Sequence, residues 1–188
     1  MAILLTAAVA HSAEAPQWWK NLHRVSRMEA AFVQESESAV FGKLTKEGSL
    51  QLSRGGRFRV AYTKGIILVS DGTQLIQYDP AAKTAQRMDL RTATRDMPLL
   101  NVLADPASLE AYYTTKADGE TRMILEPKRK DLPKVTVEGH GAFLQRIAWT
   151  DPTGANQVLN LKAPRTPAKD FPSSTFIFTA PAGTRWIQ

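Results

Sequence analysis

The stretch GSLQLSRGGRFRVAYTKGIILVSDGTQLIQYDP, residues 48–80, decides the fold class. In RFRVAY, the apolar residues Phe58, Val60 and Tyr62 occupy every second position, which is the period of a strand with two unlike faces. Asp71-Gly72 separates two apolar runs, as a hairpin loop does. The stretch therefore predicts consecutive antiparallel strands joined by short turns.

The same pattern continues on both sides of this stretch. Short β-like runs bounded by turn residues occupy 30–36, 49–54, 57–63, 65–72, 74–80, 84–90, 121–128, 134–139, 143–151, 156–164 and 174–181. No internal repeat or long linker divides the chain. Many short strands with short connections predict a meander that curls into a barrel or half-barrel.

Helical patterns are few. Trp18, Leu22, Val25 and Met28 recur at spacings of four, three and three, which predicts a helix over 18–28. Residues 95–106, RDMPLLNVLADP, predict a second helix with Asp96 as its N-cap, and PASLEAYY (106–113) predicts a short third one. Such helices would cover one open side of a curved sheet.

The first residues have the pattern of an export signal. Residues 2–10 are apolar, too short to span a bilayer as a helix, and end in the small-x-small sequence Ala8-Val9-Ala10. The basic region that usually opens such a leader is missing, since the first Lys or Arg is Lys20. We interpret 1–15 as an export leader and 16–188 as a single domain. The alternative is a disordered or helical tail.

Charge alone leaves several partners open. The chain of 188 residues carries 24 Lys and Arg against 18 Asp and Glu, a net charge of +6. Such a surface can attract nucleic acid, anionic lipid or an acidic partner, and an ordinary solvated surface explains it equally well. The densest basic run, EPKRKDLPK (126–134), contains two prolines and indicates a solvated loop. Because the aromatic residues fall mostly in the strands, we predict no nucleic-acid binding.

The residues that perform most enzymatic chemistry are missing or scattered. The chain has no cysteine, which excludes disulfides, thiolate nucleophiles and Cys-ligated zinc. Its three histidines, at positions 11, 23 and 140, form no paired metal motif. Asp71 and Asp79 directly precede Gly and Pro, where aspartate forms turns, so we interpret them as turn residues rather than a catalytic pair. We predict a non-enzyme that needs neither metal nor cofactor.

Residues 48–80 resemble the core of the LolA family of periplasmic outer-membrane lipoprotein carriers. That family has a Gly-x-Leu strand, an Arg-Pro-Gly-Arg-Phe turn, then Ser-Asp-Gly and a Tyr-Asn/Asp-Pro turn. Further similar segments follow the family order: AAFVQ (30–34), MPLLNVL (97–103), LEPK (125–128) and STFIFTAPAGTRWI (174–187). Gly55 stands where the family usually has Pro, and Val60 where it often has Trp.

The resemblance implies a mainly β fold: an unclosed antiparallel β-barrel with a helical lid enclosing an apolar cavity. It also implies a monomeric carrier that ferries acylated lipoproteins across the periplasm, from an inner-membrane ABC transporter to an outer-membrane receptor. By the same resemblance, Arg54 is expected to latch the lid through hydrogen bonds to its backbone. The candidate acyl-binding residues are Phe32, Leu50, Leu52, Phe58, Val60, Tyr62, Leu99, Leu100, Leu103, Trp149, Phe176 and Phe178.

Two other functions stay open. A LolA-like protein could carry another envelope lipid, such as a glycolipid or a pigment ester, on the same scaffold. The domain could also act as an envelope sensor or scaffold without shuttling any cargo. The missing lipid-modified cysteine favours a soluble carrier over the related anchored receptor.

Overall fold

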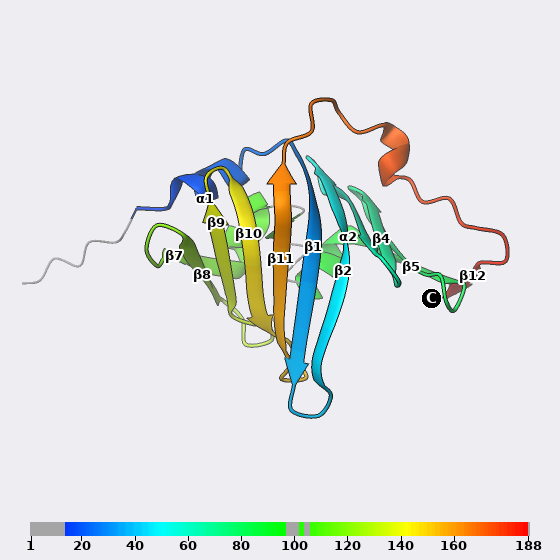
Figure 1. Ribbon diagram of the computed structural model, residues 1–188, viewed down its shortest axis with the longest axis horizontal. Helices are drawn as coiled ribbons and strands as arrows, with labels where there is room; N and C mark the ends of the chain where they lie inside the picture. Colours follow the sequence, from blue (N-terminus) through cyan, green and yellow to red (C-terminus); the bar gives the residue numbers. More distant parts are fainter. Residues whose placement is uncertain (1–13, 97–101, 104–105, 188) are drawn as a thin grey trace, which may run out of the picture.

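The computed structural model describes residues 14–96, 102–103 and 106–187, which form one large curved sheet with a few short helices (Figure 1). The strands are β1 (Arg27–Ser38), β2 (Gly42–Ser53), β3 (Arg57–Tyr62), β4 (Ile67–Asp71), β5 (Gln74–Asp79), β6 (Thr84–Asp89), β7 (Tyr113–Ala117), β8 (Arg122–Pro127), β9 (Val135–His140), β10 (Phe143–Thr150), β11 (Asn156–Arg165) and β12 (Arg185–Ile187). The helices are α1 (Gln17–Leu22), α2 (Leu90–Asp96), η1 (Pro106–Ser108), α4 (Leu109–Tyr112) and η2 (Ser173–Phe176).

The sheet has the order β12-β6-β5-β4-β3-β2-β1-β11-β10-β9-β8-β7. Two meanders, β1 to β6 and β7 to β11, join where β1 pairs with β11, from Glu29 opposite Arg165 to Glu37 opposite Asn156. All neighbours are antiparallel except β12, which runs parallel to β6. Because β7 and β12 lie at opposite edges, the barrel does not close. The predicted fold, an unclosed barrel of mainly antiparallel strands with helices, is confirmed.

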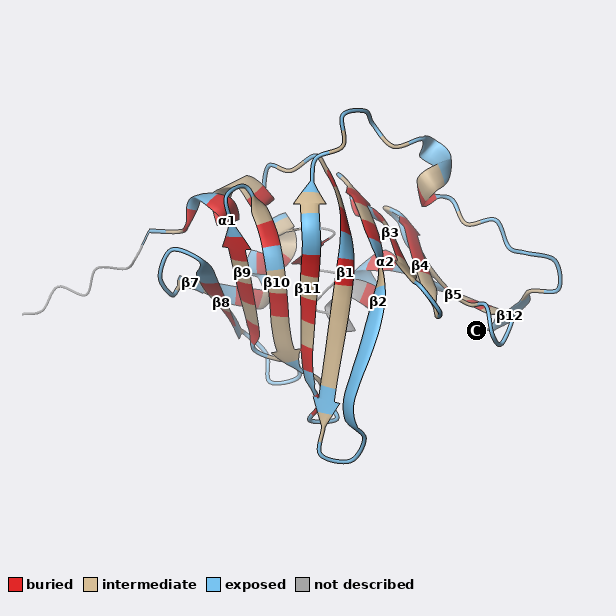
Figure 2. Cartoon of the chain, in the orientation of Figure 1, coloured by how far each residue is buried: buried red, intermediate tan, exposed pale blue. Residues whose placement is uncertain are grey.

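The helices α2 and α4 lie behind the sheet in the view of Figure 1, on its concave side. Buried residues follow an alternating pattern along most strands (Figure 2), for example Phe58 and Val60 in β3. This alternation places one row of apolar side chains against the helices and the other row outside. The main core therefore lies between the concave face and its helical cover.

The first predicted helix is only partly right. α1 ends at Leu22, and β1 begins at Arg27, so Met28 belongs to a strand. Met28 is opposite Leu52 of β2, and both side chains are buried. The helical spacing of Met28 was coincidental, because the residue also continues the two-residue period of Ala30 and Phe32. Trp18 of α1 is buried as the helical stripe predicts.

A helix that was not predicted, α2, directly precedes most of the segment of the second predicted helix, of which residues 102–103 are described as helical. α2 ends at Asp96, and residues 97–101 lie outside the described residues, so the role of Asp96 as the cap of a following helix stays a prediction. At the start of α2, the carboxylate of Asp89 accepts a hydrogen bond from the Thr92 N–H, at 3.1 Å, and stabilises the first turn. Most of the predicted segment, 97–101 and 104–105, lies outside the described residues. The short helix predicted over 106–113 is confirmed by η1 and α4.

The strand predicted over 174–181 does not form. The segment begins with the 3-10 helix η2, in which the Thr175 N–H donates to the Pro172 carbonyl at 2.9 Å. The chain then runs along the outside of the sheet to β12 (Figure 1). Prolines at both ends, Pro172 and Pro181, lack the backbone N–H that a regular strand pair needs.

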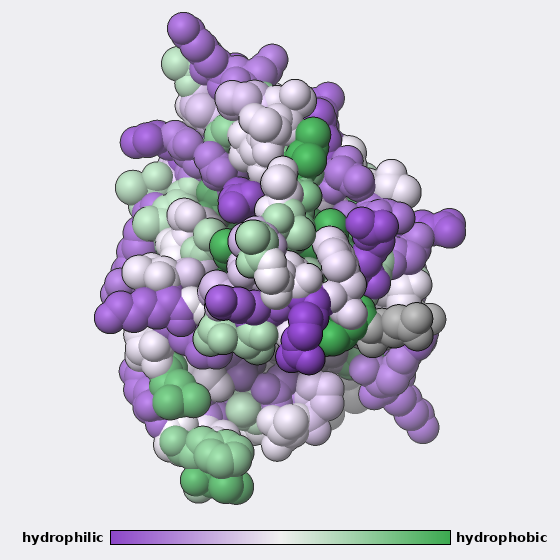
Figure 3. Space-filling view, turned by 90° about the vertical axis from the view of Figure 1, so that its right-hand side faces the viewer, coloured by the Kyte–Doolittle hydropathy of each residue, from purple (hydrophilic) through white to green (hydrophobic). Residues whose placement is uncertain are grey.

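The hairpin of β1 and β2 projects beyond the rest of the sheet (Figure 1). Its tip is held by Ser38, whose hydroxyl accepts a hydrogen bond from the Phe41 N–H at 2.9 Å. Val40 and Phe41 are 80% and 79% exposed there, and hydrophobic atoms gather at the lower end of Figure 3, where the tip lies. The described residues thus include an apolar tip that the sheet does not cover.

Candidate functional site

The concave face is built from cross-strand rows of apolar side chains. Leu50 of β2 lies opposite Ala30 on one side and Val60 on the other, and Leu52 lies opposite Phe58. All five side chains are buried. Directly opposed residues in a sheet point to the same face, so the register gives a continuous apolar surface.

Phe32 and Tyr62 mark the lower limit of this apolar surface. Their rings pack edge to face, with centroids 5.2 Å apart and planes at 83°. The Phe32 ring lies over Gly48, where an added Cβ would collide with Phe32 Cζ and with the Ala61 carbonyl oxygen. The close approach of ring and backbone therefore requires glycine at this position.

Helices supply the opposite wall. Leu90 and Ala93 of α2, together with Val102, Leu103 and Leu109, are buried in the same cluster as the strand residues. In this arrangement the apolar surface is closed by short helices rather than by further strands. Both of the described walls are apolar.

The structure brings most of the predicted acyl-binding residues together. Phe32, Leu50, Leu52, Phe58, Val60 and Leu103 belong to the buried cluster, and Tyr62 and Trp149 pack against it. Leu99 and Leu100 lie outside the described residues. Their part in binding a lipid remains a prediction.

Phe176 and Phe178, the other two candidate acyl-binding residues, lie away from the concave face, so the structure does not bring them together with the rest. Phe176 lies against the Arg57 guanidinium, 5.8 Å from the ring centroid, and Arg57 alternates with the inward-facing Phe58. Phe178 packs against Tyr78, with centroids 5.2 Å apart. The neighbour of Tyr78, Gln77, lies opposite Leu68 and faces inward with it. Because successive side chains of a strand alternate, Tyr78 points to the convex face. Both phenylalanines therefore belong to a small apolar cluster on the convex face.

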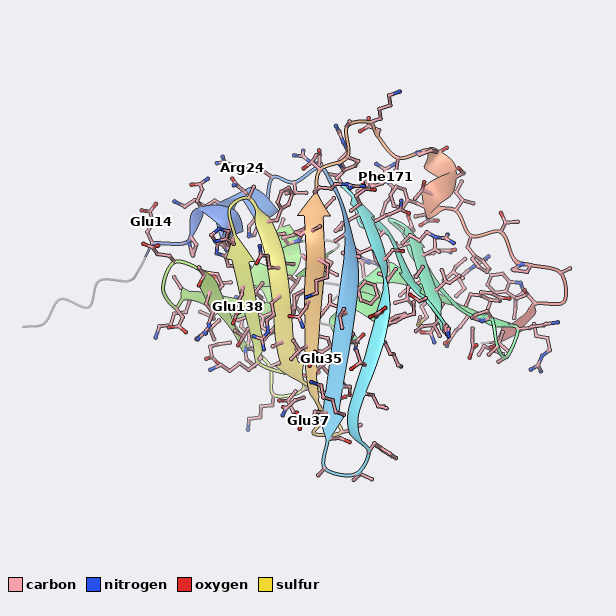
Figure 4. All side chains as sticks on the ribbon, viewed as in Figure 1. Glu14, Arg24, Glu35, Glu37, Glu138 and Phe171 are labelled. Carbon is pink, nitrogen blue, oxygen red and sulfur yellow. The ribbon has the colours of Figure 1, made fainter. Side chains whose placement is uncertain are left out.

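The rest of the convex face is polar. Glu35 pairs with Lys43 at 2.8 Å, and Glu138 pairs with Arg146 at 3.0 Å. The two glutamates and Glu37 are labelled in Figure 4, on the side of the sheet away from the helices. Exposed ion pairs add little stability, so we interpret this face as a solvated surface.

A chain of polar side chains occupies the concave side below Phe32. Tyr62 donates a hydrogen bond to Gln34, and the Gln34 amide donates to Gln157 at 3.0 Å. The Gln157 amide donates in turn to Ser36 at 2.8 Å and to Asp151 at 2.9 Å. The concave side thus changes from apolar to polar along its length. Sequence reasoning missed this network, although the alternation of Phe32, Gln34 and Ser36 was a signal for it.

Arg54 lies at the other end of the concave face, in the turn between β2 and β3. Its Nη2 donates a hydrogen bond to the Arg24 carbonyl at 2.8 Å, and its own N–H donates to the Ser26 carbonyl at 3.0 Å. Arg54 also lines a cavity of about 220 Å³ together with Leu103 and Pro106 of the cover. The hydrogen bond goes to the α1–β1 connection, where Figure 4 labels Arg24, and the bonds of Arg54 to the lid backbone stay a prediction because most of that segment lies outside the described residues.

Two tyrosines of the concave face differ in their hydroxyl partners. The Tyr62 hydroxyl is bonded to Gln34, whereas the Tyr113 hydroxyl is buried without a hydrogen-bond partner within the described part of the chain. Burial raises the pKa of Tyr62, and burial raises the pKa of Tyr113 to about 12. Both side chains therefore stay protonated at neutral pH. Sequence reasoning did not single out Tyr113, because the strand β7 was not predicted.

The aspartates singled out in the sequence act in turns. Asp71 accepts hydrogen bonds from the N–H groups of Thr73 and Gln74, both at 2.8 Å, and these bonds hold the pKa of its carboxyl below the usual value. Asp79 accepts from the N–H groups of Ala81 and Ala82. The turn interpretation is confirmed for both. The described ranges contain no cluster of three or more acidic or histidine side chains that could hold a metal, and no helix there could span a bilayer.

The comparison with known proteins agrees with this architecture. Residues 23–179 match the family model described as outer membrane lipoprotein carrier protein LolA. The outer-membrane lipoprotein carrier proteins of Salmonella typhimurium and Salmonella newport are each 29% identical over 189 residues, with 96% of this chain and 92% of the relative covered.

Solved structures show the same fold at low identity. A LolA superfamily protein from Nitrosomonas europaea superposes with a TM-score of 0.50 and 10% identity, covering 88% of this chain and 99% of that one. An uncharacterized conserved protein from Thermus thermophilus gives a TM-score of 0.56 and 12% identity, covering 91% and 94%. The sheet order, the apolar concave face under its helices and the match over most of the chain lead to one conclusion: the chain belongs to the LolA family of outer membrane lipoprotein carrier proteins.

Proposed function

We propose that the protein is a periplasmic carrier that binds the acyl chains of lipoproteins against the concave face of its sheet. The observation that carries this proposal is the continuous apolar surface from Met28 to Val60, which is covered by short helices in the described part of the chain. The names of the Salmonella relatives, outer-membrane lipoprotein carrier proteins, support the same cargo. By this proposal, the carrier receives cargo from an inner-membrane ABC transporter and delivers it to an outer-membrane receptor.

The energetics of lipid transfer explain why such a surface is needed. Each methylene exposed to water costs about 0.8 kcal/mol, so one long acyl chain costs on the order of 10 kcal/mol. A carrier must offset most of this cost with an apolar wall. It must also release the chain again, so it needs no tight fit and no reactive group.

The helical cover has to move for cargo to enter. Leu50, Phe58 and Leu109 are at most 1% exposed, so an acyl chain reaches the concave face only when α2 and α4 separate from it. The carrier therefore alternates between a closed empty state and an open loaded state. The partner proteins shift this equilibrium through their different affinities for the two states.

The direct test is release of a lipidated protein from inner membranes that contain the transporter. The purified chain should move the acylated lipoprotein into the soluble fraction, and it should leave a variant without the acylated cysteine unaffected. Failure to release any lipoprotein from competent membranes would contradict the shuttling role.

A second assay identifies the cargo class. An environment-sensitive apolar dye should bind the folded protein and be displaced by acylated, but not by deacylated, lipoprotein. Displacement by free envelope lipids alone would favour the carrier of another lipid. Equal displacement by both lipoprotein forms, or no dye uptake, would favour a sensor or scaffold.

A further inference from the structure

Tyr113 is the first residue of β7, directly after α4. It is 1% exposed and belongs to the same buried cluster as Leu109 and Leu125. Two residues further along β7, Thr115 lies opposite Leu125, which faces the concave side. Because side chains two residues apart in a strand share a face, Tyr113 also lies on the concave face. The hydroxyl is nevertheless without a hydrogen-bond partner in the described structure.

Three polar side chains of this face are paired, whereas the buried Trp18 Nε1 is, like the Tyr113 hydroxyl, without a hydrogen-bond partner in the described structure. The Tyr62 hydroxyl donates to Gln34, Gln157 donates to Ser36, and the Ser70 hydroxyl accepts from the Gly72 N–H at 3.1 Å. A buried hydroxyl without a partner destabilises the folded state relative to phenylalanine, which has the same ring. A polar group that is unpaired in the empty protein is explained when a ligand completes it.

We propose that the Tyr113 hydroxyl binds the cargo by donating a hydrogen bond to the ester carbonyl of an acyl chain. This inference rests on the proposed function, in which acyl chains enter between the sheet and its helical cover. It adds a chemical class to the cargo: acyl esters are preferred over plain hydrocarbon or ether-linked chains.

The position of Tyr113 in the sheet suits the polar end of an acyl chain. β7 is an edge strand, so Tyr113 lies at the rim of the concave face, while Leu125, its partner Val135 and the partner of Val135, Trp149, follow on successive strands toward the centre. The carbonyl stays at the rim, and the methylenes extend across these apolar residues. Since burial raises the pKa of Tyr113 to about 12, the hydroxyl keeps its proton and acts as a donor at neutral pH.

The experiment compares two lipids that differ only in the carbonyl. A diacylglycerol and the dialkyl ether glycerol of equal chain length displace the apolar dye from the full chain, from Tyr113→Phe and from Tyr112→Phe. Tyr112 is the adjacent tyrosine and is only partly buried, so it provides a matched control. We expect the wild type and Tyr112→Phe to prefer the ester about tenfold, and Tyr113→Phe to bind both lipids equally.

The outcomes separate the inference from the proposed function. If the wild type binds neither lipid, the proposed function fails. If it binds both equally, or if Tyr113→Phe loses affinity for both to the same extent, the inference is overturned while the carrier function stands. Thermal unfolding of the empty protein gives a second measurement. Tyr113→Phe should be at least as stable as the wild type, and a clear loss of stability would show that the hydroxyl has a partner without cargo.

Discussion

The guanidinium of Arg54 donates a hydrogen bond to the backbone carbonyl of Arg24, thirty residues earlier in the chain, at 2.8 Å. This bond ties the β2–β3 turn to the connection between α1 and β1. Leu103, Pro106 and Ala107 of the cover line the same cavity as Arg54. Arg54 therefore lies where the sheet, the N-terminal helix and the cover meet.

We predict that Arg54→Leu folds and accepts acylated lipoprotein but passes it poorly to the receptor. Loss of one exposed hydrogen bond should lower the free energy of unfolding by only about 1 kcal/mol. The substitution should also destabilise the closed empty state. Because closure of the empty carrier favours cargo release, release to the receptor should become weaker. The measurement is transfer from the loaded carrier to receptor-containing membranes. Arg59→Leu, on the convex face of β3, is the control, and normal transfer by Arg54→Leu would remove Arg54 from the mechanism.

Gly48→Ala should lower the free energy of unfolding by about 1–3 kcal/mol, because the new Cβ collides with the Phe32 ring and the Ala61 carbonyl. Urea unfolding measures this loss. Ser49→Ala, at the neighbouring exposed position, should stay close to the wild type. Equal stability of the two variants would show that Phe32 does not pack over Gly48.

Phe176→Ala should destabilise the protein by about 2–4 kcal/mol without changing its affinity for the apolar dye. The reason is that Phe176 is buried on the convex face, beside Arg57. Val60→Ser, on the concave face, should weaken dye binding. Dye titrations at a temperature where both variants are folded make the comparison, and weaker binding by Phe176→Ala would place this residue in the lipid site.

Treatment with a chelator should leave the binding of acylated lipoprotein unchanged. The expectation follows from the scattered histidines and acids of the sequence, since acyl chains need apolar contact rather than a metal. Binding is measured before and after dialysis. A large loss that one added metal restores would contradict this prediction.

Stability should fall at high pH, and Tyr113 should account for much of the fall. The pKa of Tyr113 is about 12 in the folded protein and about 10 in the unfolded chain, so folding favours the protonated form. This contribution is complete below pH 10 and disappears as the pH rises toward 12, a change of about 2–3 kcal/mol. Urea unfolding at pH 8, 10 and 11 should show a shallower decline for Tyr113→Phe than for Tyr112→Phe. Equal slopes would contradict the raised pKa.

The sequence by itself determined most of the strands and their turns. Alternation in RFRVAY predicts that Phe58, Val60 and Tyr62 share a face, because successive side chains of a strand point to opposite sides. Asp71 and Asp79 form turns for a local reason, since their carboxylates bond to N–H groups two or three residues ahead. These features need only neighbours in the chain.

Only the tertiary structure decided which face each strand turns inward and what covers it. Phe58 and Phe176 are both aromatic residues in apolar runs, yet Phe58 pairs with Leu52 on the concave face while Phe176 packs on the convex side. Met28 fitted a helical stripe until its pairing with Leu52 placed it in β1. The physical reason is that register depends on partners far apart in the sequence. The unpaired Tyr113 hydroxyl could be recognised for the same reason only after β7, β8 and the cover were assembled.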